Sequence, residues 1–174
     1  ASDRTFHPII LRNLYYGGVE DDQWKYFQLL HQNASSYIKW NGKVSKEVIN
    51  EDIGNRQGGY SSADEWKLYG NPMIEDLESH NHKEDLMAGS VTNVIAIADD
   101  VAPCAIAENP REAIHRMQLL LNISEDHGTQ NHIEFGVDKC KLLICARPGK
   151  LREVDKLLNE EPGILTFYDK LYLL

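Results

Sequence analysis

An apolar run over residues 94–107 is interrupted by two adjacent carboxylates, Asp99 and Asp100, and this feature constrains the fold more than any other. The flanking residues are mostly β-branched or small, which predicts two short buried strands with a tight connection at residues 98–100. We therefore expect a β-hairpin with acidic residues at its tip. Because Pro103 cannot donate a hydrogen bond to a neighbouring strand, the second strand should be an edge strand or bulged there.

The two carboxylates need a compensating interaction. An ionised carboxylate that is removed from water is destabilised by several kcal/mol unless it is paired or binds a cation. Two neighbouring carboxylates also repel each other, so a divalent metal ion is a natural partner for Asp99 and Asp100. A solvated turn is the alternative interpretation, because Asp is a favoured turn residue.

The size and composition indicate an ordinary globular protein. A length of 174 residues suits a single domain over residues 1–174, and 42% hydrophobic and 26% charged residues are typical of such domains. The sequence has neither an apolar run long enough to cross a bilayer nor a basic and apolar leader, so we expect no membrane partner. Three cysteines without paired spacing favour reduced thiols and an intracellular protein, cytoplasmic or nuclear.

The net charge restricts the kinds of partner. With 18 Lys and Arg against 27 Asp and Glu, the chain carries a formal charge of -9. Free-standing nucleic-acid binders are usually basic, so binding to nucleic acid would have to depend on a local basic patch or on a metal ion.

Hairpins and amphipathic helices alternate along the chain, which predicts an α+β fold. Asn41-Gly42 separates two strand-like stretches, Ser36–Trp40 and Lys43–Ile49, and tolerates the positive φ angles of a two-residue type I′ turn. Further strands are expected at Leu142–Ala146 and Ile164–Leu174. The expected helices run from Pro8 until Gly17, from Asp21 or Asp22 as N-cap to about Asn33, from Ser62 to Leu77, from Pro110 (capped by Asn109) until Gly128, and from Leu151 to Asn159.

Two polar segments are candidate binding sites. The glycine-rich loop Gly54–Gly59 precedes a capping box at Ser62–Glu65, and a helix start after such a loop can approach a phosphate group. A plain turn is the alternative. His80 and His82 are potential metal ligands, but no further ligand stands at zinc spacing, so an exposed loop is the simpler interpretation.

Three of these motifs, taken in order, carry a family resemblance. Arg56-Gln57-Gly58-Gly59 with Ser62, Ala98-Asp99-Asp100 in a hydrophobic hairpin, and Gly136–Lys141 before an apolar stretch resemble the palm of a reverse transcriptase of the non-LTR retrotransposon type. The opening Ala1–His7 and the Asn41–Ser45 turn are also similar to segments of that family. The resemblance therefore covers nearly the whole chain.

The resemblance implies a fold and a chemistry. The fold would be a polymerase-palm-like antiparallel sheet with helices packed on one face, without fingers or thumb. The activity would be that of an RNA-directed DNA polymerase, a nucleotidyltransferase that uses two Mg²⁺ or Mn²⁺ ions. Asp99 would be the principal metal ligand and Asp100 the accessory one, and Lys139 would be a proton donor near the pyrophosphate. The substrate-binding residues would be Arg56, Gln57, Gly58, Gly59 and Ser62.

The same resemblance limits what this chain should do alone. In the family, the first metal-binding aspartate precedes the segment that Ala1–His7 resembles, so it is not in this sequence. We therefore expect an inactive palm fragment, whose template-primer and dNTP partners belong to a complete parent or to an assembly with a second chain. The alternative is a retroelement-derived module that has kept the fold for non-catalytic binding or structure.

Overall fold

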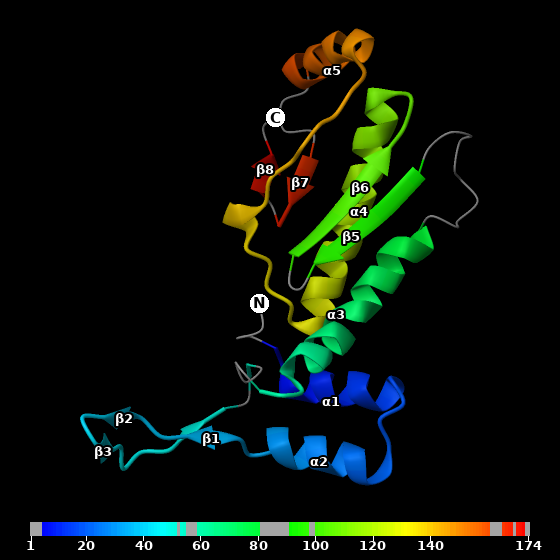
Figure 1. Cartoon of the computed structure of the whole chain (residues 1–174). Helices are drawn as coiled ribbons and strands as arrows, with labels where there is room; N and C mark the ends of the chain where they lie inside the picture. The colour runs from blue at the N-terminus through cyan, green and yellow to red at the C-terminus, as the bar shows by residue number, and fades with distance from the viewer. Residues whose placement is uncertain are drawn as a thin grey trace. The chain divides into compact units, whose positions relative to one another are not determined.

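The computed structural model describes residues 5–51, 53–54, 59–80, 91–97, 100–160, 165–168 and 170–172 (Figure 1). Helices alternate with short antiparallel strands, which confirms the predicted α+β class. The chain divides into two compact units: unit 1 comprises Ala1–Asn71 and Asn131–Ile133, and unit 2 comprises Pro72–Gln130 and Glu134–Leu174. The interpretation of residues 1–174 as one domain stays a prediction.

Unit 1 begins with two helices, α1 (His7–Tyr16) and α2 (Asp21–His31). Pro8 lies in the first turn of α1 and Gly17 caps its end, as the sequence predicts. The expected N-cap of α2 is wrong, because Glu20 occupies that position. Both aspartates follow it in the first turn, where the helix dipole favours negative charge.

Four short strands follow in unit 1: β1 (Ser35–Ser36), β2 (Lys39–Trp40), β3 (Lys43–Val44) and β4 (Ile49–Asn50). β2 pairs with β3 and β1 pairs with β4, both antiparallel. The turn between β2 and β3 consists of Asn41 with φ 47° and Gly42 with φ 76°. Positive φ at both positions is the requirement of a type I′ turn, so the predicted Asn-Gly hairpin is confirmed.

The longest helices are α3 (Ser62–Ser79) and α4 (Pro110–Asn131). In unit 2, Met73 and Leu77 of α3 and Leu120 of α4 are almost fully buried and form the core of that unit. Residues that pack against this core are Val94, Val101, Ala105, Ile123 and Phe135. α4 continues past Gly128, where the sequence predicted its end, because a buried glycine inside a helix is tolerated at modest cost.

The predicted acidic hairpin is formed by β5 (Val91–Ile97) and β6 (Asp100–Ile106), which pair antiparallel from Val91↔Ile106 to Ile97↔Asp100. Among the described residues these strands pair only with each other, so the expected central place in a larger sheet is not found. β6 is thus an edge strand, as Pro103 predicted. The expectation of fully buried strands is wrong, because Ile95 and Ile97 are 54% and 72% exposed.

The C-terminal part contains α5 (Pro148–Glu160), β7 (Leu165–Phe167) and β8 (Lys170–Tyr172). The single final strand that was expected is a hairpin instead, because Tyr168 adopts a positive φ of 48° and turns the chain. The predicted strand at Leu142–Ala146 is also wrong. This segment is half-buried in alternation, but it has no strand partner among the described residues.

The N-cap of α4 allows a direct stability test. The side-chain oxygen of Asn109 accepts a hydrogen bond from the backbone N–H of Arg111 at 2.9 Å. Asn109→Ala should lower the free energy of unfolding by about 1 kcal/mol, because alanine leaves that N–H without its cap. Urea denaturation followed by far-UV circular dichroism measures the change. Gln130→Ala, at an exposed position within α4, is the control, and equal stability of the two variants would contradict the assignment.

Candidate functional site

The tip of the β5–β6 hairpin is the candidate metal site. Asp100 is the first residue of β6, lies opposite Ile97 in the ladder, and is exposed. Ala98 and Asp99, which connect the two paired residues, lie outside the described residues. The exposed carboxylate of Asp100 is an oxygen donor of the kind that Mg²⁺ prefers, so the donor chemistry fits this metal.

The candidate substrate-binding residues lie around the start of α3. Arg56, Gln57 and Gly58 are outside the described residues. Gly59 is described, and its carbonyl oxygen accepts a hydrogen bond at 3.3 Å from the backbone N–H of Ser62, the first residue of α3. In the described residues, Gly59 therefore lies just before the start of α3, as the sequence predicted.

Lys139 ends a 3-10 turn, Val137–Lys139, and its side chain is exposed. Asp100 and Lys139 both belong to unit 2, whereas Gly59 and Ser62 belong to unit 1. Within the described ranges, no three His, Cys, Asp or Glu side chains gather closely enough to hold a metal ion. Of the two histidines considered as ligands, His82 lies outside these ranges.

A buried polar network in unit 1 was not predicted from the sequence. Glu65 of α3 is 2% exposed, and its Oε2 lies 2.9 Å from Nε2 of His31 in α2. The Ser61 hydroxyl donates to Oε1 of the same carboxylate at 2.5 Å. The network therefore joins the end of α2 to the first turn of α3.

His7 extends this network to α1. Its Nδ1 lies 3.2 Å from the carbonyl oxygen of His31, and its Nε2 lies 2.8 Å from the carbonyl oxygen of Gly54. A carbonyl oxygen only accepts, so each of these hydrogen bonds requires a proton on the ring nitrogen that makes it. The Glu65 carboxylate lies in the same network, bound to His31.

The surroundings of Glu65 change its acidity. Burial raises the pKa of this carboxyl, but hydrogen bonds from His31 and Ser61 and the positive charges of His31 and His7 lower it by more. The net pKa therefore lies below the ordinary value of 4.5. In the folded protein Glu65 is a stable anion, which suits a structural ion pair better than proton transfer near neutral pH.

The sequence held a partial signal for this network. Glu65 stood in the predicted capping box Ser62–Glu65. The contact between His31 and Glu65 spans 34 positions along the chain and required the fold to bring α2 against α3. The predicted capping box is wrong by one position, because Ser62 is the first residue of α3 and the Glu65 carboxylate binds the hydroxyl of Ser61 and a side chain from another helix.

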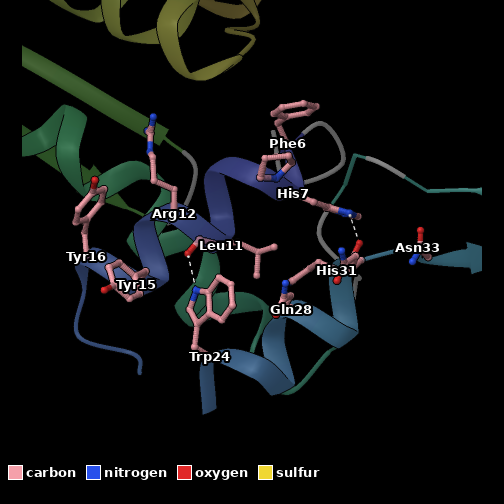
Figure 2. Close-up of a pocket in the computed structure, with 12 residues that line it drawn as sticks. Phe6, His7, Leu11, Arg12, Tyr15, Tyr16, Trp24, Gln28, His31 and Asn33 are labelled. Atoms are coloured by element: carbon pink, nitrogen blue, oxygen red, sulfur yellow. Dashed lines mark hydrogen bonds between the residues drawn. The ribbon is translucent and has the colours of Figure 1, made fainter. Parts of the chain in front are cut away.

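A pocket of about 750 Å³ opens between α1 and α2, wholly within unit 1 (Figure 2). Aromatic rings supply much of its wall, and the indole N–H of Trp24 donates to the carbonyl oxygen of Leu11 at 3.3 Å. His7 and His31 lie at one end of the pocket, where they take part in the buried network. The lining residues are Phe6, His7, Pro8, Leu11, Arg12, Tyr15, Tyr16, Trp24, Gln28, His31, Gln32 and Asn33.

Comparison with protein-family models, with curated proteins and with solved structures gave no match for this chain. A search of the described helices for a membrane span found none that combines the necessary length with sufficient apolar character.

Proposed function

We propose that this chain is a palm segment of the reverse-transcriptase type, whose complete enzyme transfers nucleotides with two metal ions. The observation that supports the proposal is the β5–β6 hairpin, in which Asp100 stands at the strand end next to Asp99. This arrangement follows from the same sequence motif that carries the family resemblance. The order of a glycine-rich segment, a helix start and an acidic hairpin along the chain adds to it.

The residues would have distinct tasks in that chemistry. Asp99 and Asp100 would hold Mg²⁺ or Mn²⁺ through their carboxylate oxygens, and the bound metal would stabilise the charge that develops during phosphoryl transfer. The pairing of Asp100 with Ile97 at the end of the β5–β6 ladder holds the backbone of Asp100 in place. Lys139, exposed on its turn, would donate a proton to the pyrophosphate or stabilise its negative charge.

The helix start at Ser62 would contribute to substrate binding. Gly59, just before this helix start, has no side chain to obstruct an approaching phosphate or sugar. The backbone N–H groups of Ser62, Asp64 and Glu65 donate to carbonyl oxygens of Gly59 and Ser61, so the contact would come from the segment before the helix. Arg56, Gln57 and Gly58 would complete this surface in the parent enzyme.

Isothermal titration calorimetry with Mg²⁺ and Mn²⁺ tests the metal assignment. The chain should bind with a dissociation constant on the order of 1 mM, because two carboxylates form an incomplete set of ligands. Asp99→Asn and Asp100→Asn should each abolish the measured heat. Asp126→Asn, an exposed aspartate of α4, is the matched control and should behave like the wild type. Equal heats for the wild type and Asp99→Asn would refute the site.

A further inference from the structure

The segment Ser35–Asn50, here named the β arm, exposes an unusual set of side chains. It holds strands β1 to β4 of unit 1, with β2 and β3 at the end away from α2 (Figure 1). Trp40 at its tip is 76% exposed. Contiguous exposed apolar groups on a monomer commonly mark a binding surface. The other large exposed hydrophobic residues of the arm are Tyr37, Ile38, Val44, Val48 and Ile49.

The β arm is also basic within an acidic chain. It carries Lys39, Lys43 and Lys46 against one carboxylate, Glu47, whereas the whole chain has a net charge of -9. All three lysines are exposed, and none forms an ion pair with a described residue. The lysines of the helices differ in this respect, because each of four pairs with a nearby carboxylate: Lys25, Lys67, Lys150 and Lys156.

The register of the arm places aromatic and positive groups together. Trp40 lies directly opposite Lys43, and Lys39 lies opposite Val44 in the β2–β3 ladder. Opposite residues of an antiparallel pair share one face, so the indole ring and the Lys43 ammonium are presented side by side. The type I′ turn at Asn41-Gly42 and the hydrogen bonds between Ile38 and Ser45 hold this geometry.

We infer that the β arm is a contact surface for single-stranded nucleic acid. Trp40 would stack on a base, and Lys43, on the same face of the ladder, would bind a flanking phosphate, which is the combination that single-strand binding proteins use. Lys39 lies on the opposite face with Val44 and adds to the positive charge of the arm. The arm supplies the local basic patch that an acidic chain needs for such a partner. A second copy of this acidic chain would also attract the lysines, so self-association is one outcome of the test. The inference does not require the proposed polymerase chemistry.

Fluorescence anisotropy with a labelled single strand of about 15 nucleotides, as DNA and as RNA, tests this inference. At about 50 mM salt the full chain should bind, and affinity should fall as salt rises. Trp40→Ala should weaken binding about tenfold, whereas Trp40→Phe should keep most of it, because phenylalanine still stacks. Lys39→Glu with Lys43→Glu should weaken binding at least about tenfold and reduce the slope of log affinity against log salt by about 0.7, the loss of the one phosphate contact assigned to Lys43.

Two controls separate the arm from general charge and aromatic effects. Lys25→Glu with Lys67→Glu makes the same change in net charge at exposed helix positions of unit 1. This variant should bind with an affinity within about twofold of the wild type, because the changed charges lie outside the arm. Tyr60→Ala removes an exposed ring outside the arm and should bind like the wild type. Absence of binding by the wild type, or equal losses in the arm and control variants, would overturn the inference. So would sedimentation showing a dimer that only the arm variants dissociate, with no binding of nucleic acid.

Discussion

Glu65→Gln is expected to lower the free energy of unfolding of unit 1 by about 3 kcal/mol at neutral pH. The substitution keeps the size of the side chain but removes the charge that His31 and His7 face in a buried place. Removing one partner of a buried, hydrogen-bonded pair costs much more stability than losing an exposed ion pair. Because all three tryptophans of the chain lie in unit 1, at positions 24, 40 and 66, tryptophan fluorescence during urea denaturation reports on this unit.

The neighbouring Asp64→Asn variant is a matched control. Asp64 lies in the same turn of α3, but its pair with Lys67 is exposed at 75% on both sides. Exposed pairs of this kind contribute about 0.5 kcal/mol or less, so this variant should be nearly as stable as the wild type. Similar losses for Asp64→Asn and Glu65→Gln would show that the buried network does not stabilise unit 1.

The same network predicts the direction of acid sensitivity. Because the pKa of Glu65 is lower in the folded than in the unfolded chain, its ionised form contributes stability above the unfolded value of about 4.5. That contribution should disappear as the pH falls below 4.5 and through the folded pKa. The stability difference between wild type and Glu65→Gln should therefore shrink on acidification in this range. A difference that grows toward low pH would contradict the assigned sign.

The second large effect concerns catalysis. The chain alone is expected to give no template-directed primer extension with Mg²⁺ or Mn²⁺. Under the proposed function, Asp99 and Asp100 would be two of three carboxylates that hold the metals, and the resemblance assigns the third to none of the 174 residues. Positioned charge is usually the largest catalytic contribution, so an incomplete metal site should reduce the rate by orders of magnitude. The net charge of -9 also opposes the phosphate contacts of a duplex.

A primer-extension assay with purified chain, labelled primer and an RNA or DNA template measures this directly. The Asp99→Asn variant distinguishes a genuine activity from a contaminating polymerase. Template-dependent extension by the wild type that disappears in Asp99→Asn would contradict the prediction of an inactive fragment. Such a result would mean that another chain supplies the remaining ligand.

Local sequence alone determined several parts of this protein. The Asn41-Gly42 turn, the Asn109 cap and the hairpin around residues 94–107 all formed where the sequence predicted them. Each depends on residues that are adjacent in the chain: positive φ at two turn positions, one side chain next to a free N–H, or two β-branched runs with a short connection. Nothing distant in the chain is needed to specify them.

Tertiary structure decided burial and pairing. The apolar pattern of residues 94–97 predicted a buried strand, but burial requires a partner on each face, and Ile95 and Ile97 face solvent. An extended segment such as Leu142–Ala146 becomes a strand only if another backbone offers hydrogen bonds. The contact of His31 with Glu65 likewise depends on how α2 packs against α3. Propensity and periodicity describe each segment separately, so which segments meet is determined only when the folded chain brings distant residues together.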